Sequence, residues 1–480
     1  MSKLFLSLPL LTFLLIQSVF PRQVPDRRQN IDFSTLEKVA LEELREKNTP
    51  GAAVVIVSGD RISYAKGLGV SNIETGAPVT SDMLFRIGST TKTFTAALLV
   101  SLAEEGKLNL NEPIGKYVKG LSPKLSRITS HQLLDDTAGL IEAAPQYGSQ
   151  EESALARTVR SWTDDLFFLE PDKFYSYSNL GFVIAGLVAE EVGGKPYADL
   201  MSERLFKPLG MHRTTFRPTI AMTYPFSPGH IARGNDKPTV QRPVSESTAT
   251  WPAGFMFSSV DDMARFAIAF MNGGKIDGKQ VLSPAVIAKM SMPYADVQSS
   301  VPGGFTNGRY SYGLFIHPYR GVQMVWHGGG MREFSSLLVM VPQYRFAIIT
   351  ITNKGGAWLF QTTKKAMELL LPLEPKEKSI SEQTLPMTER EMMGYVGTYI
   401  RPGLGEDRPA KAEILLKDGG LVLRAFGTEQ RIVKVGAHTF SVTIPGESEP
   451  VTFSLLPAGN GEAEYLHIRM RVMKRAKDAK

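Results

Sequence analysis

A serine and a lysine that are spaced for nucleophilic catalysis lie just before a long apolar stretch. Ser89 and Lys92 are three residues apart, where a polar turn gives way to the apolar residues 96–102. Residues i and i+3 share one face of a helix, so the Lys92 amino group can reach the Ser89 hydroxyl and help to remove its proton. The start of that helix also offers unpaired N–H groups and a partial positive charge to a developing oxyanion.

The same spacing occurs a second time, at Ser63 and Lys66. That pair falls in a segment that we expect to form a β-hairpin, with strands at 53–58 and 61–66. Side chains three apart on a strand point to opposite faces of the sheet. We therefore expect Ser63 to be structural and Ser89 to be the nucleophile.

A second polar run, Tyr177-Ser178-Asn179, lies before the apolar residues 183–192. It places a phenol, a hydroxyl and an amide together at a predicted loop-to-helix junction. Taken alone, the run is also typical of a helix cap, since Ser178 or Asn179 caps a helix well. Both interpretations stay open at this point.

A third run consists of His327 and three glycines, Gly328–Gly330. It precedes two apolar segments at 334–341 and 346–352, which predict an antiparallel hairpin. Glycines allow a strand to approach a ligand with its backbone. Taken alone, the run is also compatible with a glycine turn that exposes an imidazole.

The order Ser-x-x-Lys, Tyr-x-Asn, His-x-Gly resembles the serine β-lactamase and penicillin-binding-protein superfamily. The resemblance is to its class C β-lactamase branch, with esterase, D-aminopeptidase and D,D-peptidase members. It spans residues 31–371 and includes flanking blocks at 128–140 and 251–266. It implies an α/β (α+β) domain in which helices flank an antiparallel sheet, with a mostly helical part that carries Tyr177.

The resemblance also implies a role for each residue of the first two motifs. Ser89 would attack a carbonyl and form an acyl-enzyme. Lys92 and Tyr177 would move the proton, with Tyr177 acting either as a phenolate that a nearby cation favours or as a hydrogen-bonded relay. Asn179 would hold Lys92 or the amide of the substrate.

The third motif departs from the lactamase pattern, which usually has lysine where this chain has His327. With Gly328 and Gly329, His327 would border the substrate and the proton network, and the N–H groups of Ser89 and Gly330 would form the oxyanion hole. Lysine is a permanent cation for a substrate carboxylate, whereas histidine is charged only in part near neutral pH. We therefore expect small uncharged esters to be preferred over penicillins. Below about pH 6.5 the imidazole becomes charged, and the preference should shift towards substrates with a carboxylate.

No cofactor or metal ion is expected. The chain has no cysteine, and its seven histidines show neither H-E-x-x-H nor close H-x-H spacing. We expect His131, His212 and His230 to satisfy loop or cap hydrogen bonds. The net charge of +6 is modest, and no motif supports a nucleic-acid partner, so the expected partner is a small molecule or peptide with a carbonyl.

The N-terminal residues predict export. Lys3 and the apolar residues 4–20 are typical of a signal sequence, so we expect 1–22 to be a signal peptide or an N-terminal anchor. The protein would then be periplasmic or extracellular. No other stretch approaches the roughly 20 apolar residues of a spanning helix.

The C-terminal residues change in character. Residues 372–387 are charged and rich in proline, as in a linker, and residues 388–480 contain short alternating segments, the last at 465–471. These predict a small antiparallel sheet or barrel, similar to the lipocalin-like module that often follows this hydrolase branch. The basic residues of 469–480 are expected to form a solvated tail; attraction to anionic lipid or cell wall is the alternative.

The sequence thus favours an exported serine hydrolase that acts on ester or D-amino-acid peptide bonds. A non-catalytic or weakly catalytic binder of penicillin or peptidoglycan with the same fold is the alternative. The long segment 217–250, which we expect to line the pocket, carries no readable code for a substrate.

We predict that Ser89→Ala abolishes labelling by a fluorescent phosphonate and hydrolysis of p-nitrophenyl butyrate, because the attacking oxygen is lost. Ser63→Ala, which has the same motif spacing, should leave both nearly intact. Labelling that survives Ser89→Ala would refute the assignment.

Overall fold

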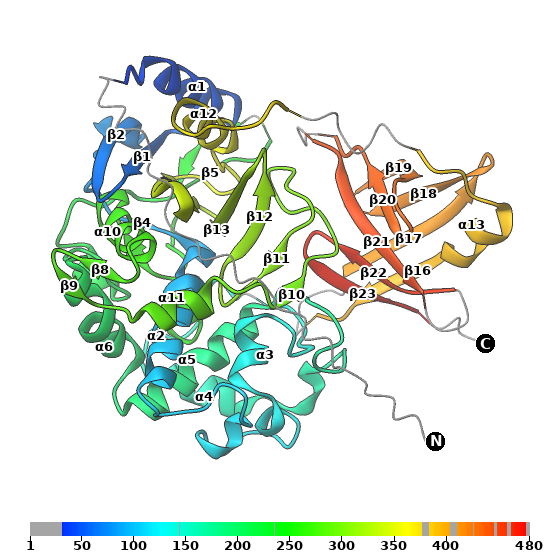
Figure 1. Ribbon diagram of the computed structural model, residues 1–480, viewed down its shortest axis with the longest axis horizontal. Helices are drawn as coiled ribbons and strands as arrows, with labels where there is room; N and C mark the ends of the chain where they lie inside the picture. The colour runs from blue at the N-terminus through cyan, green and yellow to red at the C-terminus, as the bar shows by residue number, and fades with distance from the viewer. Residues whose placement is uncertain are drawn as a thin grey trace, which may run out of the picture.

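The computed structural model describes residues 31–476, apart from 144, 235, 377–383, 404–409, 426, 446–448 and 458–461. The expected signal or anchor segment, 1–22, lies outside the described residues. The chain forms a mixed α/β domain around a large antiparallel sheet, followed by a closed eight-stranded β-barrel (Figure 1). The expected fold class is confirmed.

Nine antiparallel strands make the large sheet. In spatial order they are β10 (Ala295–Asp296), β11 (Arg309–Tyr310), β12 (Phe315–Tyr319), β13 (Val322–Gly330), β14 (Ser335–Val341), β15 (Phe346–Thr352), β1 (Gly51–Ser58), β2 (Arg61–Asn72) and β3 (Ala77–Pro78). The predicted hairpins β1–β2 and β14–β15 are both confirmed. The interior strand β1 is apolar up to its last residue, the exposed Ser58, because both faces of the sheet are covered.

Each face of the sheet has its own helices and its own apolar core. The helices α1 (Ser34–Glu46) and α12 (Phe360–Leu370) pack on the face to which Val54 of β1 points. The helices α2 (Thr91–Glu104) and α10 (Val260–Met271) pack on the opposite face, with Val55. A mostly helical part extends from α2, and its elements include α3 (Ser130–Leu134), α4 (Ala154–Ser161), α5 (Asn179–Gly193) and α9 (Trp251–Gly254) (Figure 1).

A buried ion pair fixes the 217–250 segment against the domain. The Arg86 side chain is fully buried and pairs with Glu246. Arg86 also donates to the carbonyl oxygen of Phe255 (2.6 Å), and the Glu246 carboxylate accepts from the Trp251 indole N–H (2.8 Å). Because an unpaired buried charge is very costly, these contacts hold the end of the segment beside α9.

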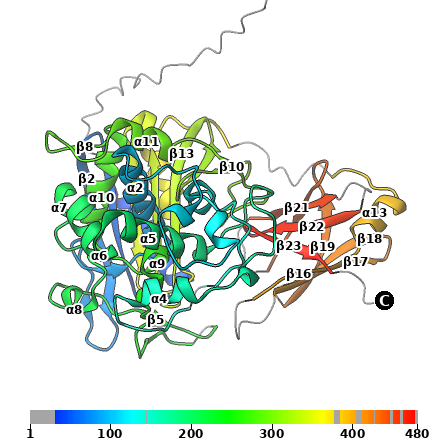
Figure 2. The ribbon, with the colours of Figure 1, turned by 90° about the horizontal axis from the view of Figure 1, so that it is seen from below.

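The barrel is closed by eight antiparallel strands around a core of packed side chains that includes Tyr399, Phe440 and Phe453. The strands are β16 (Gly397–Arg401), β17 (Ala410–Lys417), β18 (Gly420–Ala425), β19 (Thr428–Lys434), β20 (Thr439–Val442), β21 (Val451–Pro457), β22 (Ala463–Ile468) and β23 (Arg471–Arg475). Short helix α13 (Glu389–Tyr395) precedes them. In two perpendicular views, β21, β22 and β23 lie nearest to the α/β domain (Figures 1 and 2).

For residues 469–475 the interpretation as a solvated tail is wrong, whereas Lys477 and Lys480 lie outside the described residues. The predicted strand 465–471 is two strands, β22 and β23, joined by a turn at Arg469 and Met470. Val472 and Met473 are buried between basic neighbours, which hide the strand pattern. The turn also lacks the Asn-Gly or Asp-Gly signal that usually marks a two-residue hairpin.

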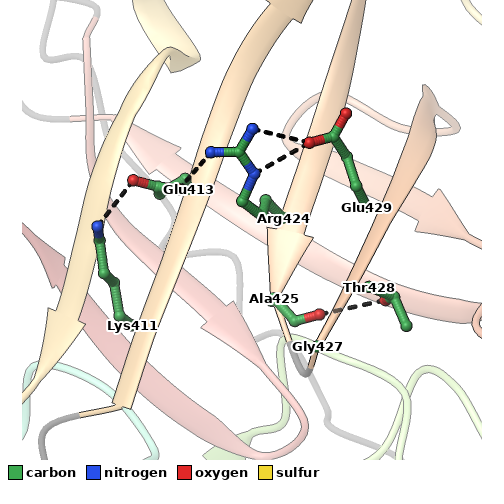
Figure 3. Close-up of a pocket in the computed structure, with 7 residues that line it drawn as sticks. All are labelled: Lys411, Glu413, Arg424, Ala425, Gly427, Thr428 and Glu429. Atoms are coloured by element: carbon green, nitrogen blue, oxygen red, sulfur yellow. Dashed lines mark hydrogen bonds and ion pairs between the residues drawn. The ribbon is translucent and has the colours of Figure 1, made fainter.

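The barrel's β17–β19 surface carries an exposed ion network. Arg424 binds Glu413 on β17 and Glu429 on β19, and Lys411 binds Glu413 as well (Figure 3). Because these charges face water, each pair contributes little to stability, about 0–1 kcal/mol. Among the described helices, none is both long and apolar enough to cross a membrane.

We predict that Arg86→Met lowers the free energy of unfolding of the α/β domain by about 3–5 kcal/mol, because Glu246 is left buried and unpaired. The double variant Arg86→Met/Glu246→Gln should recover part of that loss, since no buried charge remains. Denaturant unfolding measures the free energy of unfolding of both variants. Arg424→Ala, which removes an exposed ion pair, is the control. Equal losses in the single and double variants would contradict the argument.

Candidate active site

Ser89 lies in the 3-10 turn η1 (Gly88–Thr90), directly before α2. The Lys92 ammonium lies one turn later, and its Nζ atom is 3.2 Å from the Ser89 hydroxyl oxygen. In contrast, Ser63 and Lys66 lie on strand β2 and have separate partners. The structure therefore brings together the first pair and keeps the second apart.

The Lys92 amino group is completely buried and has three hydrogen-bond acceptors. Besides Ser89, it donates to the side-chain oxygen of Asn179 (2.6 Å) and to the carbonyl oxygen of Ala253 (2.7 Å). Burial lowers the pKa of Lys92 to about 7, against the opposing charges of Asp136 and Glu142. Near neutral pH, a large share of Lys92 is therefore a free amine that can accept a proton.

Tyr177 closes the site from the segment that precedes α5. Its ring is buried, and its centroid is 4.9 Å from Lys92 Nζ. Burial raises the pKa of the Tyr177 phenol above its ordinary value, and a hydrogen bond with Ser89 opposes this only in part. Burial therefore favours the protonated phenol, and with it the relay over the phenolate.

The glycine run lies on the end of β13 that extends beyond its neighbour β12. Pairing between these two strands ends at Phe315 and Trp326, which leaves one edge of the glycine run open. A Cβ atom on Gly88 would lie only 2.7 Å from the Gly330 nitrogen, so η1 and this edge are in contact. The contact places Ser89 and Gly330 on adjoining backbones, as the predicted oxyanion hole requires.

The hydroxyl groups of Ser336 and Thr90, which were not among the predicted site residues, hold this junction together. The Ser336 hydroxyl, on β14, donates to the carbonyl oxygen of Ile87 (2.6 Å) and contacts the Thr90 hydroxyl (2.8 Å). Their partners are distant in sequence, so only the folded sheet shows their role.

His327 is buried, and the expectation that it is partly charged near neutral pH is wrong. Its Nδ1–H donates to the Gly328 carbonyl oxygen (2.7 Å), and its Nε2 accepts from the Tyr310 hydroxyl (3.2 Å). Burial and, to a smaller extent, the charge of Lys92 lower the pKa of His327 to about 3. The imidazole is therefore neutral, and the expected gain in carboxylate binding below pH 6.5 does not follow.

Two carboxylates missing from the predicted site support its second motif. Glu142 accepts from the backbone N–H of Asn179 (2.8 Å) and from its side-chain amide. Asp136 accepts from the N–H of Ser176 through its main-chain oxygen (2.9 Å) and from the N–H of Ser178 through its side chain (3.2 Å). Both follow α3, in or beside the 128–140 block.

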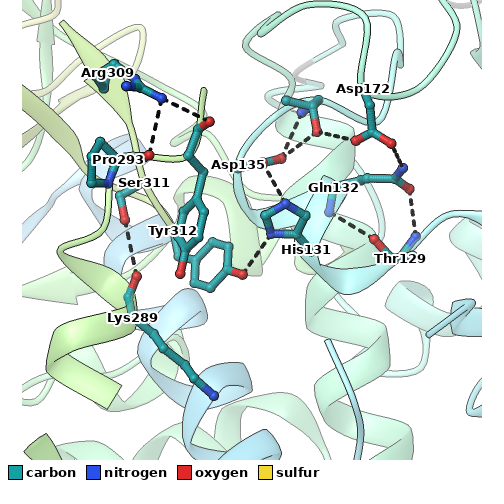
Figure 4. Close-up of polar contacts among 12 residues, drawn as sticks. Thr129, His131, Gln132, Asp135, Asp172, Lys289, Pro293, Arg309, Ser311 and Tyr312 are labelled. Carbon is teal, nitrogen blue, oxygen red and sulfur yellow. Dashed lines mark hydrogen bonds and ion pairs between the residues drawn. The ribbon is translucent and has the colours of Figure 1, made fainter. Parts of the chain in front are cut away.

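A polar cluster around Asp135, the residue before Asp136, anchors this turn (Figure 4). His131 Nδ1 lies 2.8 Å from the Tyr312 hydroxyl, and its Nε2 lies 3.4 Å from an oxygen of Asp135. His131 thus has the structural role expected of it. Among the described residues, no group of three or more His, Asp or Glu side chains is placed to hold a metal ion.

We predict that Gly329→Ala reduces kcat for ester hydrolysis by about 10²–10³, the usual cost of a lost oxyanion donor. The new Cβ would lie 1.8 Å from the Ile87 carbonyl oxygen and would force β13 away from η1. Gly328→Ala is the matched control, because the tightest contact of its Cβ is with the flexible Leu337 side chain, at 3.3 Å. Equal losses in both variants would contradict a role for the junction.

The sequence of the chain is similar to those of known proteins. The chain is 29% identical over 325 residues to penicillin-binding protein 4 of Amycolatopsis lactamdurans, covering 66% of this chain and 84% of the relative. It is 25% identical over 345 residues to protein flp of Staphylococcus aureus, covering 70% of this chain and 65% of that relative.

Two solved structures share the fold. The octameric penicillin-binding protein homologue from Pyrococcus abyssi matches with a TM-score of 0.64 at 24% identity, covering 92% of this chain and 100% of that chain. The D-amino acid amidase of Ochrobactrum anthropi SV3 matches with a TM-score of 0.57 at 22% identity, covering 69% of this chain and 97% of that chain. The model of the β-lactamase family matches residues 36–371, and the chain belongs to that family.

Proposed function

We propose that this protein is an active serine hydrolase that cleaves ester bonds or D-amino-acid amide and peptide bonds through an acyl-enzyme on Ser89. The observation that carries the proposal is the buried Lys92 amine, 3.2 Å from the Ser89 oxygen and with its pKa lowered to about 7. A general base works best when its pKa is near the working pH.

In the first half of the reaction, the Lys92 amine accepts the hydroxyl proton of Ser89 while the serine oxygen bonds to the substrate carbonyl carbon. The carbonyl electrons move to oxygen, and the backbone N–H groups of Ser89 and Gly330 stabilise the resulting negative charge. When the carbonyl re-forms, the bond to the leaving alcohol or amine breaks. The Tyr177 phenol donates a proton to that leaving group and regains one from Lys92.

In the second half, water replaces the leaving group. The Lys92 amine, through Tyr177, accepts a proton from the water as its oxygen attacks the ester carbon of the acyl-enzyme. Collapse of the second oxyanion breaks the bond to Ser89, and the serine oxygen takes a proton from Lys92, which becomes a free amine again. Asn179 keeps Lys92 aligned through both halves by its 2.6 Å hydrogen bond.

Two observations support the substrate class. Neutral His327 provides no permanent cation, which argues against a dependence on a penicillin-type carboxylate at that position. One structural relative is a D-amino acid amidase, which is consistent with acyl groups of D-configuration. We also propose, from the sequence alone, that the protein is exported.

We predict that kcat/KM for p-nitrophenyl butyrate falls tenfold per pH unit below an apparent pKa of about 7, because protonated Lys92 cannot accept the serine proton. Lys92→Arg should lose at least about 10² in rate at every pH, since a guanidinium remains charged. Stopped-flow acylation over pH 5 to 9 measures both. A flat profile, or an active Lys92→Arg variant, would assign the base elsewhere.

The substrate class is tested with the p-nitroanilides of D-alanine and L-alanine, compared at equal concentration. Preference for the D-isomer supports the proposal. A stable fluorescent-penicillin adduct on Ser89, with no turnover of esters or of either anilide, would instead show a binding protein.

A further inference from the structure

The barrel binds the backbone that carries Tyr177. Three hydrogen bonds make this contact: Tyr177 N–H to Met470 O (2.9 Å), His467 Nε2–H to Tyr175 O (3.0 Å) and Val472 N–H to Ser176 Oγ (3.3 Å). An apolar cluster of Leu169, Tyr465 and Val472 extends the same contact. The C-terminal domain thus holds three successive residues, Tyr175, Ser176 and Tyr177, at the start of the second motif.

The turn that makes the contact is conformationally strained. Arg469 and Met470, between β22 and β23, have φ of +48° and +67°, in the left-handed region that glycine or asparagine usually occupies. The N–H of Met470 is fixed by the Ser299 hydroxyl of the α/β domain (3.1 Å), and its carbonyl oxygen by Tyr177. A strained turn held at both backbone groups by a catalytic domain is consistent with a functional role.

The first residue of β23 places a cation beside the site. Arg471 forms an ion pair with Glu142 (3.4 Å), and the centre of its guanidinium lies 5.2 Å from the centroid of the Tyr177 ring. Its Nε atom is buried without a hydrogen-bond partner in the structure. The strand therefore holds a guanidinium group at the wall of the site although one of its donors is unsatisfied, which costs free energy.

A continuous chain of polar contacts leads from this cation to the nucleophile. Arg471 binds Glu142, Glu142 accepts both N–H groups of Asn179 described above, Asn179 accepts from Lys92, and Lys92 donates to Ser89. Each link is a contact between side chains or with a neighbouring backbone group, and no water is required.

We propose that the C-terminal barrel completes the active site, with its β22–β23 turn fixing the Tyr177 segment and Arg471 acting as a positioning residue that neutralises Glu142 and keeps Lys92 a free amine. This inference rests on the proposed function, because it assigns Lys92 the role of base. It makes the barrel a required part of the hydrolase rather than an appended module.

Several charged and titratable groups surround Lys92 and its neighbours. They are Asp136 and Glu142 after α3, Tyr177 before α5, His327 on β13, and Arg401 and Arg471 from the barrel. The carboxylates of Asp136 and Glu142 favour the ammonium form of Lys92, and the charge of Arg471 opposes them. Removing Arg471 takes away the positive charge that opposes the two carboxylates, so we expect the pKa of Lys92 to rise.

The test is the pH profile of kcat/KM for p-nitrophenyl butyrate in the full-length protein. Arg471→Ala should shift the acidic limb of this profile to higher pH, by at least about 0.5 pH unit. Activity near pH 6 should then fall about threefold or more and recover in part at pH 9. Arg471→Lys keeps a charge and should keep the limb near its original position. Glu142→Gln should move the limb in the opposite direction, to lower pH.

The matched control is Arg424→Ala, which removes an arginine from the exposed ion network of the same barrel and should leave the profile unchanged. A uniform loss at every pH in Arg471→Ala, with an unmoved limb, would overturn the role in neutralising Glu142. If Arg471→Ala does not fold, the test is the pH profile of Glu142→Gln. An acidic limb that does not move to lower pH in that variant overturns the proposal. Loss of phosphonate labelling in Ser89→Ala, measured in parallel, separates these outcomes from a failure of the proposed function.

Discussion

The burial of one amino group, that of Lys92, is the constraint on which the rest of the site depends. An ammonium group that is shielded from water must either have its N–H donors satisfied or lose its proton. The Lys92 side chain has three acceptors, and its pKa is also lowered to about 7. Its three acceptors come from η1, α5 and α9, which are far apart in sequence. These three elements must therefore be fixed relative to one another before Lys92 can occupy its position.

Other contacts of the fold meet that requirement. The buried Arg86–Glu246 pair fixes the chain that leads into α9 and its acceptor, the Ala253 carbonyl. Glu142 orients the amide of Asn179 so that its oxygen faces Lys92. The segment with Tyr177 is held on one side by the α/β domain and on the other by the barrel, so neither domain alone determines its position.

The parts of this arrangement that could be predicted from sequence are those encoded by short spacing or by apolar runs. Ser89 and Lys92 are one helical turn apart, and β14 and β15 are continuous apolar segments joined by a short turn. The neutral state of His327 could not be predicted, because its burial depends on Tyr310 and Phe315, which strand pairing brings beside it. The roles of Asp136 and Glu142 depend on hydrogen bonds to residues some 40 positions away in the sequence. Arg471 was missed because the two-residue turn before it contains no glycine that would mark a hairpin.

The position of β23 in the chain has a consequence for biosynthesis. It is the last strand that the structure describes, so a ribosome makes the entire α/β domain before it makes Arg471. Domains generally fold as units from the N-terminus, so the nascent chain has Ser89 and Lys92 in place while the segment with Tyr177 still lacks its barrel contacts. Under the proposed role of the barrel, the site is complete only after the barrel closes, so full activity has to wait until the end of synthesis.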